Sequence, residues 1–100
     1  MAIVTHSLAN GTDADGAIWS VEYMYDDILL ELLTIRCNNA QSSIARDVTA
    51  TSTADRADTF TFNFAAGQDQ TRNVPPGQIN KMHLTVTPSG KLDGVEWSIA

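Results

Sequence analysis

Residues 59–64 read TFTFNF, and this hexapeptide decides the fold class because phenylalanine alternates strictly with short polar residues. Alternation with a period of two is the pattern of a β-strand that buries one face. We therefore expect the three phenylalanines to line a core and the two threonines and the asparagine to face the other way.

The same alternation recurs at residues 19–25, 82–86 and 95–99, and more weakly at 3–8, 28–37 and 44–51. Stretches that favour turns separate these segments, so about seven short strands are predicted. The chain has 100 residues, of which 43% are hydrophobic, which is enough for one core. The sequence predicts an all-β fold, a single-domain antiparallel β-sandwich over residues 1–100 that is immunoglobulin-like or jelly-roll-like.

One segment allows two interpretations. Residues 26–37 read DDILLELLTIRC, and Asp26 or Asp27 could cap a helix there. We favour a strand, because β-branched Thr34 and Ile35 lie at its end and only the two aspartates separate it from the preceding strand. Such a strand would be apolar on both faces, so its second face would need a cover from the chain or from another subunit.

The tract AAGQDQTRNVPPGQ, residues 65–78, is predicted to be a long connection between two strands. Adjacent prolines cannot donate ladder hydrogen bonds and favour extended geometry before them. We expect an extended, unpaired segment at an edge or an end of the sandwich, and it is our candidate contact segment: Arg72, Asn73, Val74, Pro75 and Pro76. The alternative is a linker that crosses between two sheets.

The charges argue against some classes of partner. Six basic and twelve acidic residues give a net charge of -6, and the basic residues are scattered singly. Nucleic acids and anionic membranes are bound by clustered cations, so neither is an expected partner. No apolar run reaches the roughly 18 residues of a spanning helix, and no export signal is seen, so we expect a soluble protein.

The residues that usually carry chemistry are few. Zinc sites need three or four ligands, whereas Cys37, His6 and His83 are far apart in the sequence. We expect Cys37 to be a small buried hydrophobe and His83 to be a surface strand residue. No nucleophile elbow is present. The prediction is a protein that is not an enzyme and that has no cofactor and no metal.

The segment NGTDADG, residues 10–16, resembles the middle of a calcium loop at Asp13, Asp15 and Gly16. The register fails outside that core, because Gly11 precedes it and Glu22 falls inside a predicted strand. We expect a solvated turn here.

The polar faces of the predicted strands carry short side chains, notably Thr59, Thr61, Thr85, Thr87 and Ser98. Such a face suits a strand that only has to stay folded, or one that lies against another protein. The sequence has few of the lysines and prolines that prevent an edge strand from pairing with another chain. Pairing of an edge with a partner, or with a copy of the chain, is therefore expected.

The whole chain, with the phenylalanine ladder FTFNF, the tract AAGQDQTRNVPPG and the strand KMHLTVTP, resembles small structural proteins of tailed-bacteriophage virions. Capsid decoration (cement) proteins and immunoglobulin-like virion modules are the nearest members of that group. The resemblance implies a non-enzymatic virion protein, made in the host cytoplasm, that binds and reinforces an assembled shell. Its partner would be a major capsid or tail protein, often bound by a symmetric homo-oligomer. No catalytic or binding residue is transferred.

A second class of function stays open, namely a cellular immunoglobulin-like or carbohydrate-binding recognition module. Sugar binding needs aromatic side chains exposed on one face. Alternation assigns five of the seven aromatic residues to the core, and the remaining two, Tyr23 and Tyr25, share the face of Trp19.

Overall fold

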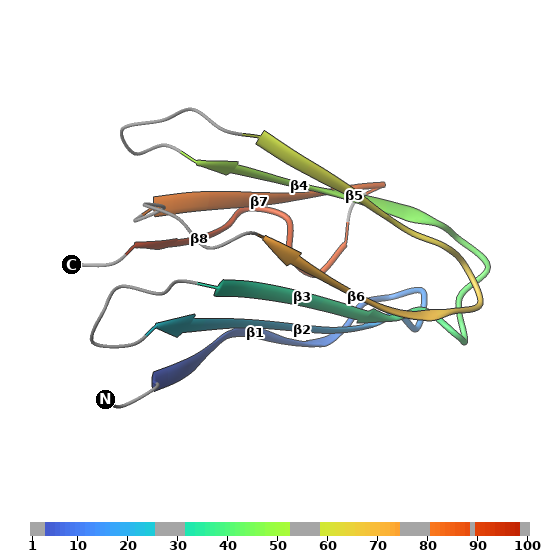
Figure 1. Ribbon diagram of the computed structural model, residues 1–100. Coiled ribbons are helices and arrows are strands. Elements are labelled where there is room, and N and C mark those ends of the chain that lie inside the picture. Colours follow the sequence, from blue (N-terminus) through green and yellow to red (C-terminus); the bar gives the residue numbers. More distant parts are fainter. Residues whose placement is uncertain (1–3, 26–31, 53–58, 75–80, 89, 99–100) are drawn as a thin grey trace.

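The protein folds into two antiparallel four-stranded sheets that pack face to face (Figure 1). The computed structural model describes residues 4–25, 32–52, 59–74, 81–88 and 90–98. The first sheet has the order β1-β2-β3-β6 and the second the order β5-β4-β7-β8. The strands in these ranges are β1 (Val4–Thr12), β2 (Ile18–Tyr25), β3 (Leu32–Asn38), β4 (Arg46–Ser52), β5 (Thr59–Phe64), β6 (Asp69–Val74), β7 (Lys81–Thr87) and β8 (Val95–Ser98). The predicted all-β sandwich is confirmed.

The second sheet follows the predicted alternation. Phe60 pairs with Ala50 on the neighbouring strand β4, and Ala50 pairs in turn with Leu84 on β7. Ala50 and Leu84 are fully buried, as is Phe64 at the end of β5. Phe60 and Phe62 are half-buried and pack against this core, because β5 is the edge strand of its sheet.

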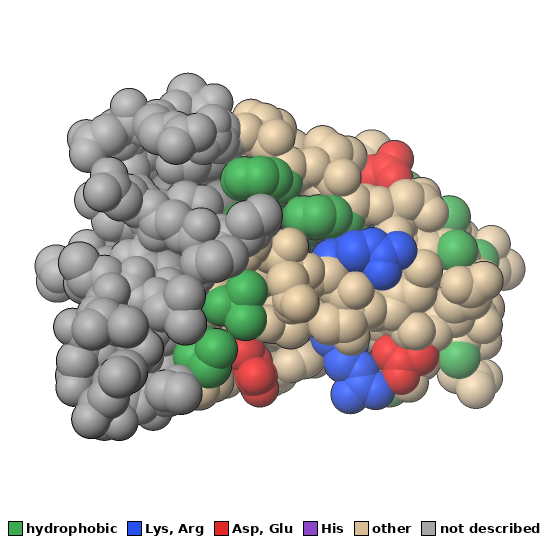
Figure 2. Space-filling model, in the orientation of Figure 1, with side chains coloured by type: hydrophobic (Ala, Val, Ile, Leu, Met, Phe, Trp, Pro, Cys, Tyr) green, Lys and Arg blue, Asp and Glu red, His purple; other side chains and the backbone are tan. Residues whose placement is uncertain are grey.

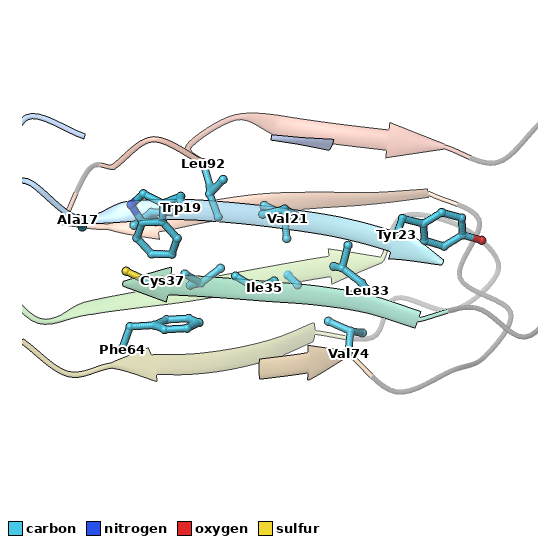
Figure 3. Packing of buried hydrophobic residues seen from close by; sticks show 14 residues of the cluster. Ala17, Trp19, Val21, Tyr23, Leu33, Ile35, Cys37, Phe64, Val74 and Leu92 are labelled. Atoms are coloured by element: carbon cyan, nitrogen blue, oxygen red, sulfur yellow. The ribbon is translucent and has the colours of Figure 1, made fainter. Parts of the chain in front are cut away.

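In the first sheet, Trp19, Val21 and Tyr23 on β2 lie opposite Cys37, Ile35 and Leu33 on β3. Figure 3 shows these two rows side by side, with Phe64 and Leu92 reaching the same core. All of these residues are buried, and they close the space between the sheets. The core is therefore built from both sheets together.

The predicted strand at 28–37 is confirmed where the structure describes it, as β3, so the helical alternative is wrong for Leu32–Asn38. Residues 26–31 lie outside the described ranges. The second face of β3 carries half-buried Leu32 and Thr34 and exposed Arg36. In its described part the strand is therefore not apolar on both faces, and no cover is needed there.

The tract at 65–78 is not the unpaired connection that the sequence predicts. Its residues Asp69–Val74 form β6, which pairs with β3 from Asn38↔Asp69 to Leu33↔Val74. Gln70, Arg72 and Val74 face inward and alternate with exposed residues. Only Val74 is apolar, so the sequence shows no alternation of apolar and polar residues here. The alternative of a linker between the sheets is confirmed in a shorter form, residues 65–68, where Gly67 has a positive φ of 77°.

Candidate protein-interaction surface

A group of charged and polar side chains surrounds Arg46, where β4 begins. The side chain of Arg46 is 0% exposed, and its Nη2 lies 2.9 Å from Asp15 Oδ2 and 3.2 Å from Asp13 Oδ2. Its Nη1 donates to Asn39 Oδ1 at 3.0 Å and to the carbonyl of Ile44 at 3.1 Å. A buried cation needs such partners because its desolvation is costly.

The turn that follows β1 is built around the carboxylate of Asp13. Oδ1 accepts the backbone N–H groups of Asp15 and Ala17, each at 3.1 Å, and Oδ2 accepts the indole N–H of Trp19 at 2.9 Å. The Asp13 side chain is 8% exposed and that of Asp15 is 46% exposed. The predicted solvated turn is thus wrong for Asp13, because its carboxylate is buried against Arg46 and accepts protein N–H groups.

This cluster is suited to holding the two sheets together. Asp13 follows a strand of the first sheet, whereas Arg46 begins a strand of the second. The oxygens of Asp13 already face protein donors, which leaves them poorly placed to exchange protons with a substrate. Within the described ranges, no group of three or more His, Cys, Asp or Glu side chains is placed to hold a metal ion.

Cys37 is fully buried on β3, as the sequence predicts. Burial raises the pKa of its thiol from 9.0 to about 11, because the thiolate would lose its hydration. The side chain therefore packs as a neutral hydrophobe and is not a nucleophile at neutral pH.

His83 lies on the outer face of β7, partly exposed, and its Nδ1 is 3.1 Å from Glu96 Oε1 on β8. The prediction of a surface strand residue is confirmed. The side chain of His6 is outside the described part of the structure.

The predicted contact segment has a different structure from the one expected. Val74 is buried, Arg72 is half-buried and only Asn73 is exposed, so these three do not form a projecting loop. They are extended and lie at a sheet edge, as predicted, but they pair with β3 and are not the unpaired segment expected. Pro75 and Pro76 lie outside the described ranges. The contact role of the segment stays a prediction.

Arg72 points across the gap between the sheets towards β5. Its guanidinium carbon lies 5.6 Å from the centre of the Phe64 ring, and its Nη2 donates to the carbonyl of Asn63 at 3.4 Å. Beside it, the side chain of Gln70 accepts the N–H of Ala65 at 2.7 Å. Two polar inward residues of β6, Arg72 and Gln70, thus cap the carbonyl of Asn63 in β5 and the N–H of Ala65 directly after it.

The outer face of the second sheet carries a regular array of short side chains. Pairing aligns the central row as Thr61, Thr49 and Thr85. One flanking row is Thr59, Thr51 and His83, and the other is Asn63, Asp47 and Thr87. We call these nine residues the threonine face.

Charge on the threonine face is confined to opposite ends. Asp47 Oδ1 accepts the amide N–H of Asn63 at 2.9 Å, and His83 contacts Glu96. The hydroxyls of Thr49 and Thr61 lie 3.5 Å apart at its middle. Thr59, Thr61, Asn63 and Thr87 are exposed, so this surface can meet another molecule. Sequence alternation places threonines outward, but it does not show that three strands align them in rows.

The side of the sandwich between β5 and β6 is a second open surface. Figure 2 shows hydrophobic side chains reaching the surface in this strip, with a Lys or Arg side chain next to them. Half-buried Phe60 and Phe62 lie on β5 along this side. Alternation predicts that Phe60 and Phe62 face inward, but it does not predict that their strand lies at the edge of its sheet, where both stay half-buried.

No helix in the described ranges is long and apolar enough to cross a membrane. Scans against protein-family models, curated proteins and solved structures each found no significant match to the chain.

Proposed function

We propose that this chain is a non-enzymatic virion structural protein that binds and reinforces an assembled capsid or tail shell. The threonine face carries the proposal. It is a partly exposed face of mostly short, uncharged side chains centred on Thr49, with Asp47 and His83 in its two flanking rows. Burying such side chains costs less conformational entropy and less desolvation than burying the Lys, Glu and Asp residues that dominate most surfaces.

The other polar groups support a structural role. The Arg46 cluster joins the two sheets, and the Cys37 thiol is buried and neutral. These side chains serve the fold, whereas catalysis needs reactive groups that converge on an accessible pocket. The partner in this proposal is a major capsid or tail protein, whose repeated lattice presents the same surface many times.

Sugar recognition is less well supported. Trp19, Tyr23 and Phe64 are buried, so none of these rings can stack on a sugar. The side chains of Tyr25 and Trp97 lie outside the described part of the structure.

The proposal is tested on shells assembled from the major capsid or tail protein encoded beside this chain. The protein should sediment with the shells, saturate at a fixed ratio to the shell subunits and raise the temperature at which they dissociate. Absence of virion genes from the neighbourhood, or a protein that stays in the supernatant, would contradict the proposal.

A matched pair of variants locates the binding surface. Thr49→Lys places a charge at the centre of the threonine face, and it should weaken sedimentation with shells at least tenfold. Thr34→Lys is the control, because Thr34 is also half-buried on an inner strand but faces outward from the opposite sheet. Equal effects of the two variants would show that the threonine face is not the contact.

A further inference from the structure

The four edge strands of the sandwich differ in how well they are protected. β1 is interrupted by a register shift between Ser7 and Ala9, and β8 has four residues including Glu96. β6 carries Asp69 and Arg72. β5 alone among them combines six regular residues with no charge, no proline and no register shift in its ladder. Bulges, charges and short length are the devices that keep edges from pairing, and β5 lacks all three.

The free backbone groups of β5 can be assigned from their alternation. In an antiparallel strand, the N–H and C=O of one residue point to the same side, and successive residues alternate. The carbonyl of Asn63 and the N–H of Ala65 both point away from β4, since Arg72 and Gln70 cap them. Thr59 and Thr61 therefore also direct their backbone groups to the free side. No described strand pairs with them there.

We propose that a second copy of the chain pairs with β5 through its own β5, antiparallel and about a twofold axis at Phe60. Thr59 then lies opposite Thr61 of the second copy, and Thr61 opposite its Thr59. Each pair exchanges two N–H···O=C bonds, so four bonds form without displacing Arg72 or Gln70 from the groups they cap. The result is one continuous eight-stranded sheet.

Side chains support this register. Phe60 would face Phe60 of the second copy in a pair without direct backbone bonds, where side chains come closest. Phe62 lies diagonally beside that pair, so the half-buried rings of both copies would cover one another. Because β5 has no charged residue, this twofold pairing places no like charges opposite each other, although each chain has a net charge of -6.

Pairing of two copies would also enlarge the surface that binds a shell, because it places two threonine faces in one sheet. This part of the argument rests on the proposed function. Three strands of six residues cover about 300 Å², given the usual spacing between strands and rise per residue. A stable interface buries about 800 Å² on each partner. Two threonine faces in one sheet double the area, to about 600 Å² before the surrounding loops are counted.

Light scattering over a range of concentrations, without any shell present, tests the pairing. The unmodified protein should approach twice the 10.8 kDa mass of one chain. Thr61→Pro removes an N–H that β4 does not use, so it should fold but stay monomeric. Thr61→Ala keeps that N–H and should still dimerise. A wild-type monomer at every concentration, or a folded Thr61→Pro dimer, would overturn the proposal.

A cross-link tests the same register without relying on the proline variant. In a Cys37→Ala background, Phe60→Cys places two thiols opposite each other at the axis, within reach of a disulfide. Oxidation should give a covalent dimer, whereas Thr49→Cys, two strands from the axis, should not. Failure of Phe60→Cys to cross-link in a folded protein would overturn the pairing. Shell sedimentation separates the two proposals, because a monomer that still binds shells contradicts only the pairing, and a dimer that does not bind contradicts only the function.

Discussion

Arg46 and Asp13, 33 residues apart in the sequence, meet across the two sheets with Nη2 of the arginine 3.2 Å from Oδ2 of the aspartate. The same aspartate accepts the indole N–H of Trp19, the largest side chain of the core. One buried carboxylate thus fixes both a cation and an aromatic ring. This contact should set much of the stability of the sandwich.

Asp13 and Asp15 offer a matched comparison of a buried and an exposed acid on one arginine. Asp13→Asn should lower the free energy of unfolding by about 3 kcal/mol, because it leaves a buried cation poorly compensated. Asp15→Asn should cost less than about 1 kcal/mol, since solvent screens the exposed carboxylate. Urea unfolding followed by tryptophan fluorescence measures both. Equal losses would contradict the importance of the buried contact.

The phenylalanines of β5 should contribute unequally. Phe64 is fully buried and packs edge-on against Trp19 with ring centres 5.5 Å apart. Phe64→Ala should therefore cost about 3–5 kcal/mol in the free energy of unfolding. Phe60→Ala should cost clearly less, since Phe60 is half-buried, and it should also weaken dimerisation. Thermal unfolding of both variants at low concentration, where the chain is monomeric, isolates the effect on the fold.

The buried thiol predicts how stability depends on alkaline pH. In the unfolded chain Cys37 ionises near pH 9.0, whereas in the folded protein its pKa is about 11. The folded state binds the proton more tightly, so this contribution is complete below pH 9.0 and is lost as the pH rises towards 11. The loss should be about 2 kcal/mol. Cys37→Ala should remove this part of the pH dependence, and an unchanged profile would contradict the burial.

Arg36 and Asp69 link β3 to the edge strand β6 through two contacts, Nε to Oδ1 at 3.1 Å and Nη2 to Oδ2 at 2.6 Å. The hydrogen bonds from Arg36 hold the pKa of the Asp69 carboxyl below its usual value. Titration by nuclear magnetic resonance should show this, and Arg36→Gln should return the pKa to the ordinary range. An Asp69 pKa that is the same in both proteins would mean that the ion pair does not persist in solution.

Alternation of apolar and polar residues predicted β2, β5, β7 and β8, because apolar residues recur at every second position in each of them. β6 was missed for a physical reason, since an edge strand can place Gln70 and Arg72 at the open side of the core, where their polar ends reach backbone groups of β5. Leu92 was also missed, because a single apolar residue in a turn shows no periodicity, although it is fully buried.

The Arg46 cluster left one signal in the sequence. Arg46 lies two residues before Val48 and four before Ala50, so alternation places its side chain on the same inward face as theirs. A charged residue at such a position is either buried with charged or polar partners, or turned outward by an irregularity in the strand. The sequence does not identify its acidic partners. The contact depends on how the turn after β1, in the first sheet, is placed against the start of β4, in the second sheet. The rows of the threonine face depend in the same way on the registers of β4 with β5 and β7.

Cryo-electron microscopy of shells incubated with the protein tests the proposed function most directly. The proposal predicts density for a pair of β-sandwiches at regular lattice positions on the outside of the shell, with the threonine faces turned towards the shell subunits. Shells whose outer surface carries no added density at saturating protein would contradict it.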